Sequence, residues 1–111
     1  MNILAIGAHP DDIAISCSGT LKKYIERGDS VSICTVTNGC YGHTEIKPSD
    51  LAEIRIAEDK AMADSLGAKY FTLNVDDQFV DSNDTKQVDL LVDVLREAKP
   101  DLILTHASDD Y

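Results

Sequence analysis

The chain has 111 residues, with 20 acidic against 10 basic side chains and a formal net charge of −10. This length allows one domain, and 43% hydrophobic residues are enough for a packed core, which excludes a disordered tail. The negative charge argues against binding to nucleic acid or to an anionic membrane surface. Because the apolar run at residues 3–6 is short and follows no basic segment, neither a transmembrane helix nor a signal peptide is predicted.

Short apolar or β-branched runs alternate along the chain with amphipathic stretches, and glycine or proline follows most of them. In chain order, the pattern predicts a strand at 2–7, a helix at 19–27, a strand at 30–37, a helix from 49 or 50 to 66, a strand at 69–75, a helix at 85–99 and a strand at 101–105. The apolar stripes of the second and third helices are predicted at Leu51, Ile54, Ala57 and Ala61, and at Val88, Leu91, Val92 and Leu95.

This alternation predicts an α/β protein, a Rossmann-like three-layer α/β/α fold with a mainly parallel sheet. The first and fourth strands are expected to be neighbours at a switch point, where such sheets bind their ligands beyond the carboxyl ends of the strands. Four loops should therefore carry the chemistry: residues 7–18, 38–48, 76–84 and 106 onward.

The three cysteines indicate the compartment. They are odd in number and form no C-x-x-C pair, so neither disulfides nor a thiolate zinc site is predicted. A reduced, cytoplasmic location is expected.

The first of these loops contains a cluster of an imidazole and two carboxylates, His9-Pro10-Asp11-Asp12, in place of a dinucleotide-binding glycine motif. Such donors suit a divalent metal: His9 and one aspartate can be ligands, and the other aspartate can act as a base. An Asx turn or a helix cap with an incidental histidine is the alternative. Because the cluster directly follows the first strand of a parallel sheet, the metal site is favoured.

The last predicted strand also ends in a histidine, His106, and Asp109 and Asp110 follow it. If the first and fourth strands are neighbours, both acidic loops face one crevice. His106 would then either orient a ligand or simply pack against the strand ends. His43, in the second loop, is expected to be a solvated histidine rather than a metal ligand.

Several motifs, each on the expected element, together resemble the PIG-L or LmbE-like family of zinc-dependent N-deacetylases. They are Ala8-His9-Pro10-Asp11-Asp12, Gly19-Thr20-Leu21, Val36-Thr37-Asn38-Gly39, Arg55-x-x-Glu58 with Leu66-Gly67, Lys99-Pro100-Asp101 and Thr105-His106. The resemblance implies a Rossmann-like fold and removal of an acetyl group from an N-acetylglucosamine-type sugar conjugate. Ala14, Ser16, Ser18 and Cys40 depart from the family pattern.

Carried over by motif position, the resemblance implies that His9 and Asp12 ligate Zn²⁺ and that Asp11 is the general base. Arg55, Asp77 and Asn38 would contact the substrate. Arg55 could equally be an exposed helix residue paired with Glu53 or Glu58. Other divalent transition metals would also suit such donors.

The family's third ligand lies in a His-x-x-His-like element after the Asp-Tyr pair with which this chain ends. Residues 1–111 are therefore expected to be the N-terminal part of a single deacetylase domain, inactive alone. The alternatives are a non-catalytic sugar- or nucleotide-binding module and a different metal-dependent amidase. The sequence does not set the oligomeric state, and an oligomer is compatible with it.

Overall fold

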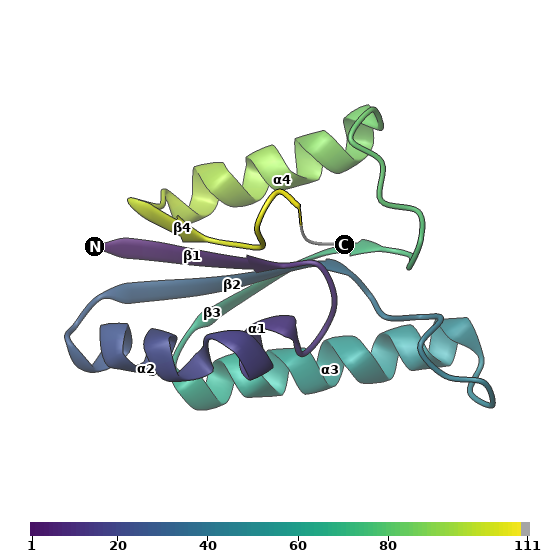
Figure 1. Ribbon diagram of the computed structural model, residues 1–111, viewed down its shortest axis with the longest axis horizontal. Helices are drawn as coiled ribbons and strands as arrows, with labels where there is room; N and C mark the ends of the chain where they lie inside the picture. The colour runs from purple at the N-terminus through teal and green to yellow at the C-terminus, as the bar shows by residue number, and fades with distance from the viewer. Residues whose placement is uncertain (110–111) are drawn as a thin grey trace.

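The computed structural model describes residues 1–109 as a four-stranded sheet with helices on both faces (Figure 1). In chain order, the strands are β1 (Asn2–Gly7), β2 (Ser30–Thr37), β3 (Lys69–Val75) and β4 (Leu102–Leu104). The helices are α1 (Asp12–Ser16), α2 (Ser18–Glu26), α3 (Pro48–Leu66) and α4 (Thr85–Ala98). All paired strands are parallel, in the order β3-β2-β1-β4, and Figure 1 shows α4 on one face and the other helices opposite it.

This topology confirms the predicted α/β class and the predicted pairing of the first and fourth strands. β1, β2 and β3 have the predicted bounds. β4 is shorter than predicted at both ends. At its carboxyl end, Thr105 bonds to the carbonyl oxygen of Ile6 through its side-chain hydroxyl, at 2.9 Å.

The short helix α1 was not predicted, because five residues cannot display a helical period. It follows Asp11, which has a left-handed backbone (φ 74°), and it ends at Cys17, where φ is −145°. The Ser16 and Ser18 hydroxyls donate back to carbonyl oxygens of α1. α1 therefore directly follows the turn after β1, and this turn lies at the carboxyl edge of the sheet.

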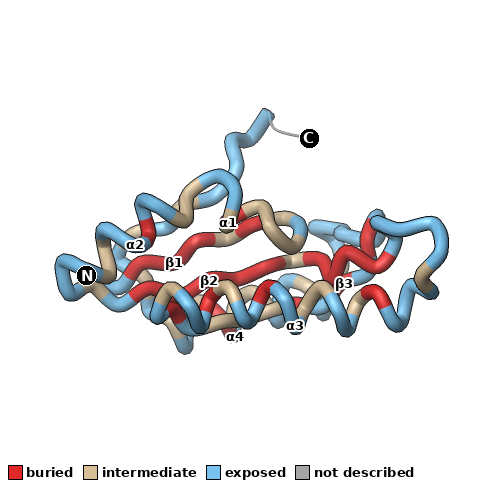
Figure 2. The backbone as a smooth tube through the Cα atoms, turned by 90° about the horizontal axis from the view of Figure 1, so that it is seen from below, coloured by how far each residue is buried: buried red, intermediate tan, exposed pale blue. Residues whose placement is uncertain are grey.

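The core consists of two apolar clusters, one on each face of the sheet, because successive strand side chains point to opposite faces. On the face covered by α2 and α3 the buried residues are Ile3, Ala5, Ile13, Leu21, Val31, Ile33, Ala63 and Ala68. On the α4 face they are Leu4, Cys34, Leu73, Val75 and Val94. β1 and β2 are largely buried along their length (Figure 2), as expected for central parallel strands.

The predicted apolar stripe of α3 is correct at Leu51 and wrong at its other three positions. Ile54, Ala57 and Ala61 are exposed, whereas the buried positions are Leu51, Asp59 and Ala63. The helix is rotated from the predicted orientation because a carboxylate, Asp59, occupies the centre of its sheet-facing side. A hydrophobic pattern that places every charged residue in solvent cannot predict a buried helix face that contains Asp59.

The predicted stripe of α4 is correct in part. Leu91 and Leu95 pack against the core as predicted, but Val88 is exposed. Val94, which the stripe omitted, is the buried residue of this helix.

Among residues 1–109, Thr37 has the buried side-chain hydroxyl for which no hydrogen-bond partner is found. A buried hydroxyl without a partner destabilises a fold, and valine has nearly the same shape without the polar atom. We expect Thr37→Val to raise the free energy of unfolding by about 1–2 kcal/mol, measured by urea denaturation. Thr20→Val, at an exposed position, is the matched control, and a destabilised Thr37→Val chain would contradict the expectation.

The three cysteines are all free thiols, as predicted. Burial raises the pKa of the Cys34 thiol to about 11, and it raises the pKa of Cys17 and Cys40 as well. In the part of the chain that the structure describes, no helix is both long and apolar enough to span a bilayer.

Candidate active site

The loop that follows β1 turns sharply onto α1, and this tight turn requires glycine at its start. A Cβ atom on Gly7 would lie 3.0 Å from a side-chain carbon of Ile13 and 3.3 Å from Cβ of Asp12. Asp11 then takes the left-handed conformation that non-glycine residues rarely adopt. Its side chain makes no helix-capping hydrogen bond, so the capping alternative does not account for Asp11.

His9 and Asp12 lie side by side in this turn. Oδ2 of Asp12 accepts a hydrogen bond from the backbone N–H of His9 at 2.9 Å, and Nδ1 of His9 lies 3.8 Å from the same oxygen. The His9 imidazole is exposed and Asp12 is half-buried. The turn therefore presents a nitrogen and a carboxylate together to solvent.

His106, at the end of β4, reaches the same turn. Its Nε2 accepts a hydrogen bond from the backbone N–H of Ala8 at 3.0 Å and lies 3.4 Å from Oδ2 of Asp12. The predicted meeting of the first and fourth strand ends is therefore confirmed. Asp109 is exposed, and Asp110 lies outside the described residues.

The imidazole of His9 and the carboxylate of Asp12 are groups of the kinds that bind zinc. The 3.8 Å between His9 and Asp12 is close to the separation of about 3.4 Å expected for two ligands of one tetrahedral zinc. Within residues 1–109, however, no three His, Cys, Asp or Glu side chains are grouped so that they could hold a metal. A catalytic zinc takes three protein ligands, so His9 and Asp12 would be at most two of them.

The carboxylate of Asp11 faces α3. Nη1 of Arg55 lies 4.0 Å from Oδ2 of Asp11, and the two side chains are 32% and 48% exposed. The sequence left Arg55 between a substrate-binding role and a pair with Glu53 or Glu58. The described residues show an ion pair of Arg55 with Asp11 and none with either glutamate.

The other two predicted substrate residues hold the second and third strand-end loops together. The carboxylate of Asp77 accepts backbone N–H bonds from Gly39 and Tyr41, both at 3.1 Å. The side-chain amide of Asn38 donates to Asp76 at 2.8 Å, and its oxygen accepts the N–H of Cys40. Both side chains are buried, so each stabilises the loop that it joins.

A cavity of about 320 Å³ lies among these loops and is open to solvent. Its lining residues are His9, Pro10, Asp11, Ile15, Gly39, Gly42, Arg55 and Asp77. Four of the predicted site residues therefore face one space. Asp12 and Asn38 lie beside it but do not line it.

The part played by Gly39 in this cavity was not predicted. A Cβ atom there would lie 3.3 Å from side-chain carbons of both Arg55 and Pro10, and φ is 71°. The sequence indicated that a strand ends before Asn38-Gly39, but it did not indicate the close approach of Arg55 to Gly39. His43 is exposed and its Nδ1 accepts the N–H groups of Glu45 and Ile46, which fits the expected loop histidine.

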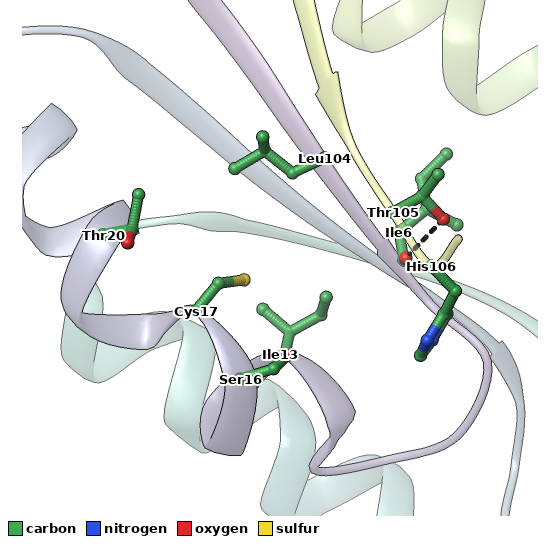
Figure 3. Close-up of a pocket in the computed structure, with 8 residues that line it drawn as sticks. All are labelled: Ile6, Ile13, Ser16, Cys17, Thr20, Leu104, Thr105 and His106. Atoms are coloured by element: carbon green, nitrogen blue, oxygen red, sulfur yellow. Dashed lines mark hydrogen bonds between the residues drawn. The ribbon is translucent and has the colours of Figure 1, made fainter. Parts of the chain in front are cut away.

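A second cavity, of about 420 Å³, lies on the β4 side of the turn (Figure 3). Its lining is half apolar and half polar by residue: Ile6, Ile13, Cys17 and Leu104, and Ser16, Thr20, Thr105 and His106. The imidazole of His106 both lines this cavity and lies 3.4 Å from the carboxylate of Asp12.

Comparison with known proteins gives consistent results. Residues 4–111 match the family model described as PIG-L, GlcNAc-PI de-N-acetylase. The diacetylchitobiose deacetylase of Thermococcus kodakarensis is 41% identical over 69 residues, which are 60% of this chain and 26% of that protein. The solved N,N'-diacetylchitobiose deacetylase from Pyrococcus horikoshii has 34% identity and a TM-score of 0.82, over 91% of this chain and 39% of that one.

The chain therefore belongs to the PIG-L family, as its motifs indicated. It spans well under half the length of both deacetylases. The 4-carboxy-2-hydroxymuconate hydratase from Pseudomonas putida is similar in fold alone, with a TM-score of 0.87 at 24% identity over 99% of this chain and 49% of that one. Because that protein is named as a hydratase, this fold is compatible with more than one reaction, and the reaction depends on the residues of the site.

Proposed function

We propose that this protein is a zinc-dependent hydrolase that removes the acetyl group from an N-acetylglucosamine-type sugar conjugate. The observation that carries the proposal is the cavity in which Asp11, His9, Arg55 and Asp77 meet. A general base, a metal-ligand nitrogen and a fixed cation around one open space suit hydrolysis of a polar amide. The named activities of the two similar deacetylases support the same reaction.

His9 and Asp12 would hold the zinc ion. When bound, zinc lowers the pKa of a coordinated water and polarises the acetamide carbonyl. The bond from the Asp12 oxygen to the His9 backbone fixes the two side chains relative to each other. Ligands held in this way lose little freedom when the metal binds.

Asp11 would take the proton from the attacking water as a new C–O bond forms at the acetamide carbon. The same proton then goes to the nitrogen as the C–N bond breaks, which releases acetate and a free amine. The carboxylate suits this role because it is half-exposed, lines the cavity and is not used to cap α1.

Arg55 would bind a hydroxyl, carboxylate or phosphate of the sugar conjugate, since its guanidinium lines the cavity beside Asp11. Asp77 and Asn38 would shape the opposite wall, because they fix the loop backbone that carries Gly39 and Gly42. The size and shape of the sugar conjugate would determine whether Asp77 and Asn38 touch it directly or only through the loop backbone.

The test is acetate release from N-acetylglucosamine conjugates by the protein expressed from its complete reading frame. We expect hydrolysis that is lost on treatment with a chelator and restored by zinc. Stoichiometric zinc without acetate release would contradict the proposal. Tight sugar binding with neither zinc nor acetate release would instead favour the non-catalytic binding module.

A further inference from the structure

A buried carboxylate on α3 is not used in the reaction proposed above. Asp59 is 1% exposed and lies on the sheet-facing side of the helix, between Leu51 and Ala63. An ionised group in such a place loses its hydration, and an apolar residue of similar shape is often at least as stable. Core packing therefore does not explain an aspartate at this position.

The partners of Asp59 come from three other elements. Its Oδ2 accepts hydrogen bonds from the hydroxyl of Thr35 at 2.6 Å and from the phenol of Tyr70 at 3.0 Å. Burial raises the pKa of Tyr70, and the nearby charge of Asp59 raises it further. These two hydroxyls hold the carboxylate in one orientation and direct its other oxygen toward the turn after β1.

That other oxygen, Oδ1, lies 3.5 Å from the backbone nitrogen of Asp11, whose N–H donates to it. The bond reaches the residue with the left-handed backbone, φ 74°. Such a conformation persists in a non-glycine residue only where its surroundings enforce it. Arg55, one helical turn before Asp59, contacts the carboxylate of the same residue. α3 therefore holds Asp11 at two points, the main chain through Asp59 and the side chain through Arg55.

We propose that Asp59 is a positioning residue for Asp11, which fixes the backbone of the general base and so directs its carboxylate into the cavity. This inference rests on the proposed function, in which Asp11 accepts the proton. Thr35 and Tyr70 support Asp59 and do not touch the reacting atoms.

The test compares two substitutions of Asp59 in the protein expressed from its complete reading frame. Asp59→Leu keeps the branched shape but removes the acceptor, and we expect kcat to fall about 10- to 100-fold with KM changed less than about twofold. Asp59→Asn keeps an oxygen for the Asp11 N–H, and we expect it to restore kcat to within about threefold of the unchanged protein.

Asp59→Leu leaves two buried hydroxyls without an acceptor, so it can fail to fold. The triple variant Thr35→Val, Tyr70→Phe, Asp59→Leu removes these hydroxyls and leaves an apolar cluster of the same shape. We expect it to fold, to bind zinc as tightly as the unchanged protein and to show the same loss of kcat. Tyr24→Phe is the control, because it makes the same chemical change at a half-buried tyrosine of α2 outside this group of hydrogen bonds, and we expect its kcat to be unchanged.

A folded triple variant with unchanged kcat would overturn the inference, and so would an Asp59→Asn variant as inactive as Asp59→Leu. Asp11→Asn, assayed beside them, separates this failure from failure of the proposed function. If Asp11→Asn is inactive while the triple variant is fully active, only the positioning role is wrong. If Asp11→Asn keeps full activity, the general-base assignment itself is wrong.

Discussion

Asp11→Asn is expected to lower kcat for acetate release by about 10²- to 10⁴-fold, the contribution of a positioned general base. Asparagine has the same shape as aspartate and is one of the residue types that tolerate the left-handed backbone seen at position 11. The substitution therefore removes the ability to accept a proton and leaves the turn in place. Initial-rate measurements over a range of substrate concentration separate kcat from KM.

The matched control for Asp11→Asn is Asp64→Asn, the same chemical change on the exposed side of α3. Asp64 pairs with Lys60 at 3.0 Å, outside the cavity. Surface ion pairs contribute little, so both variants should unfold at nearly the same urea concentration. Equal activity of the two variants would remove Asp11 from the mechanism.

His9→Ala and Asp12→Ala are each expected to weaken zinc binding by more than about 100-fold, the upper end of what loss of an outer-shell partner costs. Each removes one of the two donors in the first loop, and Asp12→Ala also removes the acceptor of the His9 N–H. Competition with a chromophoric chelator measures the affinity without any need for turnover.

His43→Ala is the control for these two variants. This exposed histidine lies in the second loop, where it accepts backbone N–H groups, and it does not line the cavity. Zinc affinity should therefore be unchanged in His43→Ala. A loss as large as that of His9→Ala, or an unchanged affinity in His9→Ala, would show that the ligands are elsewhere.

The sequence predicted the features that depend on local pattern and on strand ends. Three strands have their predicted bounds, because each is a short apolar run closed by a glycine or a polar turn. The position of His9, Asp11 and Asp12 at one edge of the sheet was predictable because they come directly after the first strand, and the carboxyl ends of parallel strands lie at the same edge. His106 joined them for the same reason.

Features that depend on long-range contacts were not predictable in this way. The orientation of α3 depends on Asp59, whose partners lie 24 and 11 residues away. A single sequence treats such a charge as solvent-facing, so three of the four predicted stripe positions lay on the wrong side of the helix. The bonds of Asp77 to the second loop cross 38 and 36 residues, and the spacing of residues carries no signal for them.

The pairing of β1 with β4 also determines when the site can form. β1 pairs first with β2, which begins at Ser30, whereas the bond from Ala8 to His106 joins residues 98 apart. Closing so long a segment costs more chain entropy than the nearer pairing, and non-local contacts form late in folding. Among the described residues, the turn that carries His9 and Asp11 thus meets its most distant partner in the sequence, His106, only when β4 docks. On a ribosome, which releases the N-terminal strands first, β1, β2 and β3 would therefore be able to pair before His106 reaches this turn.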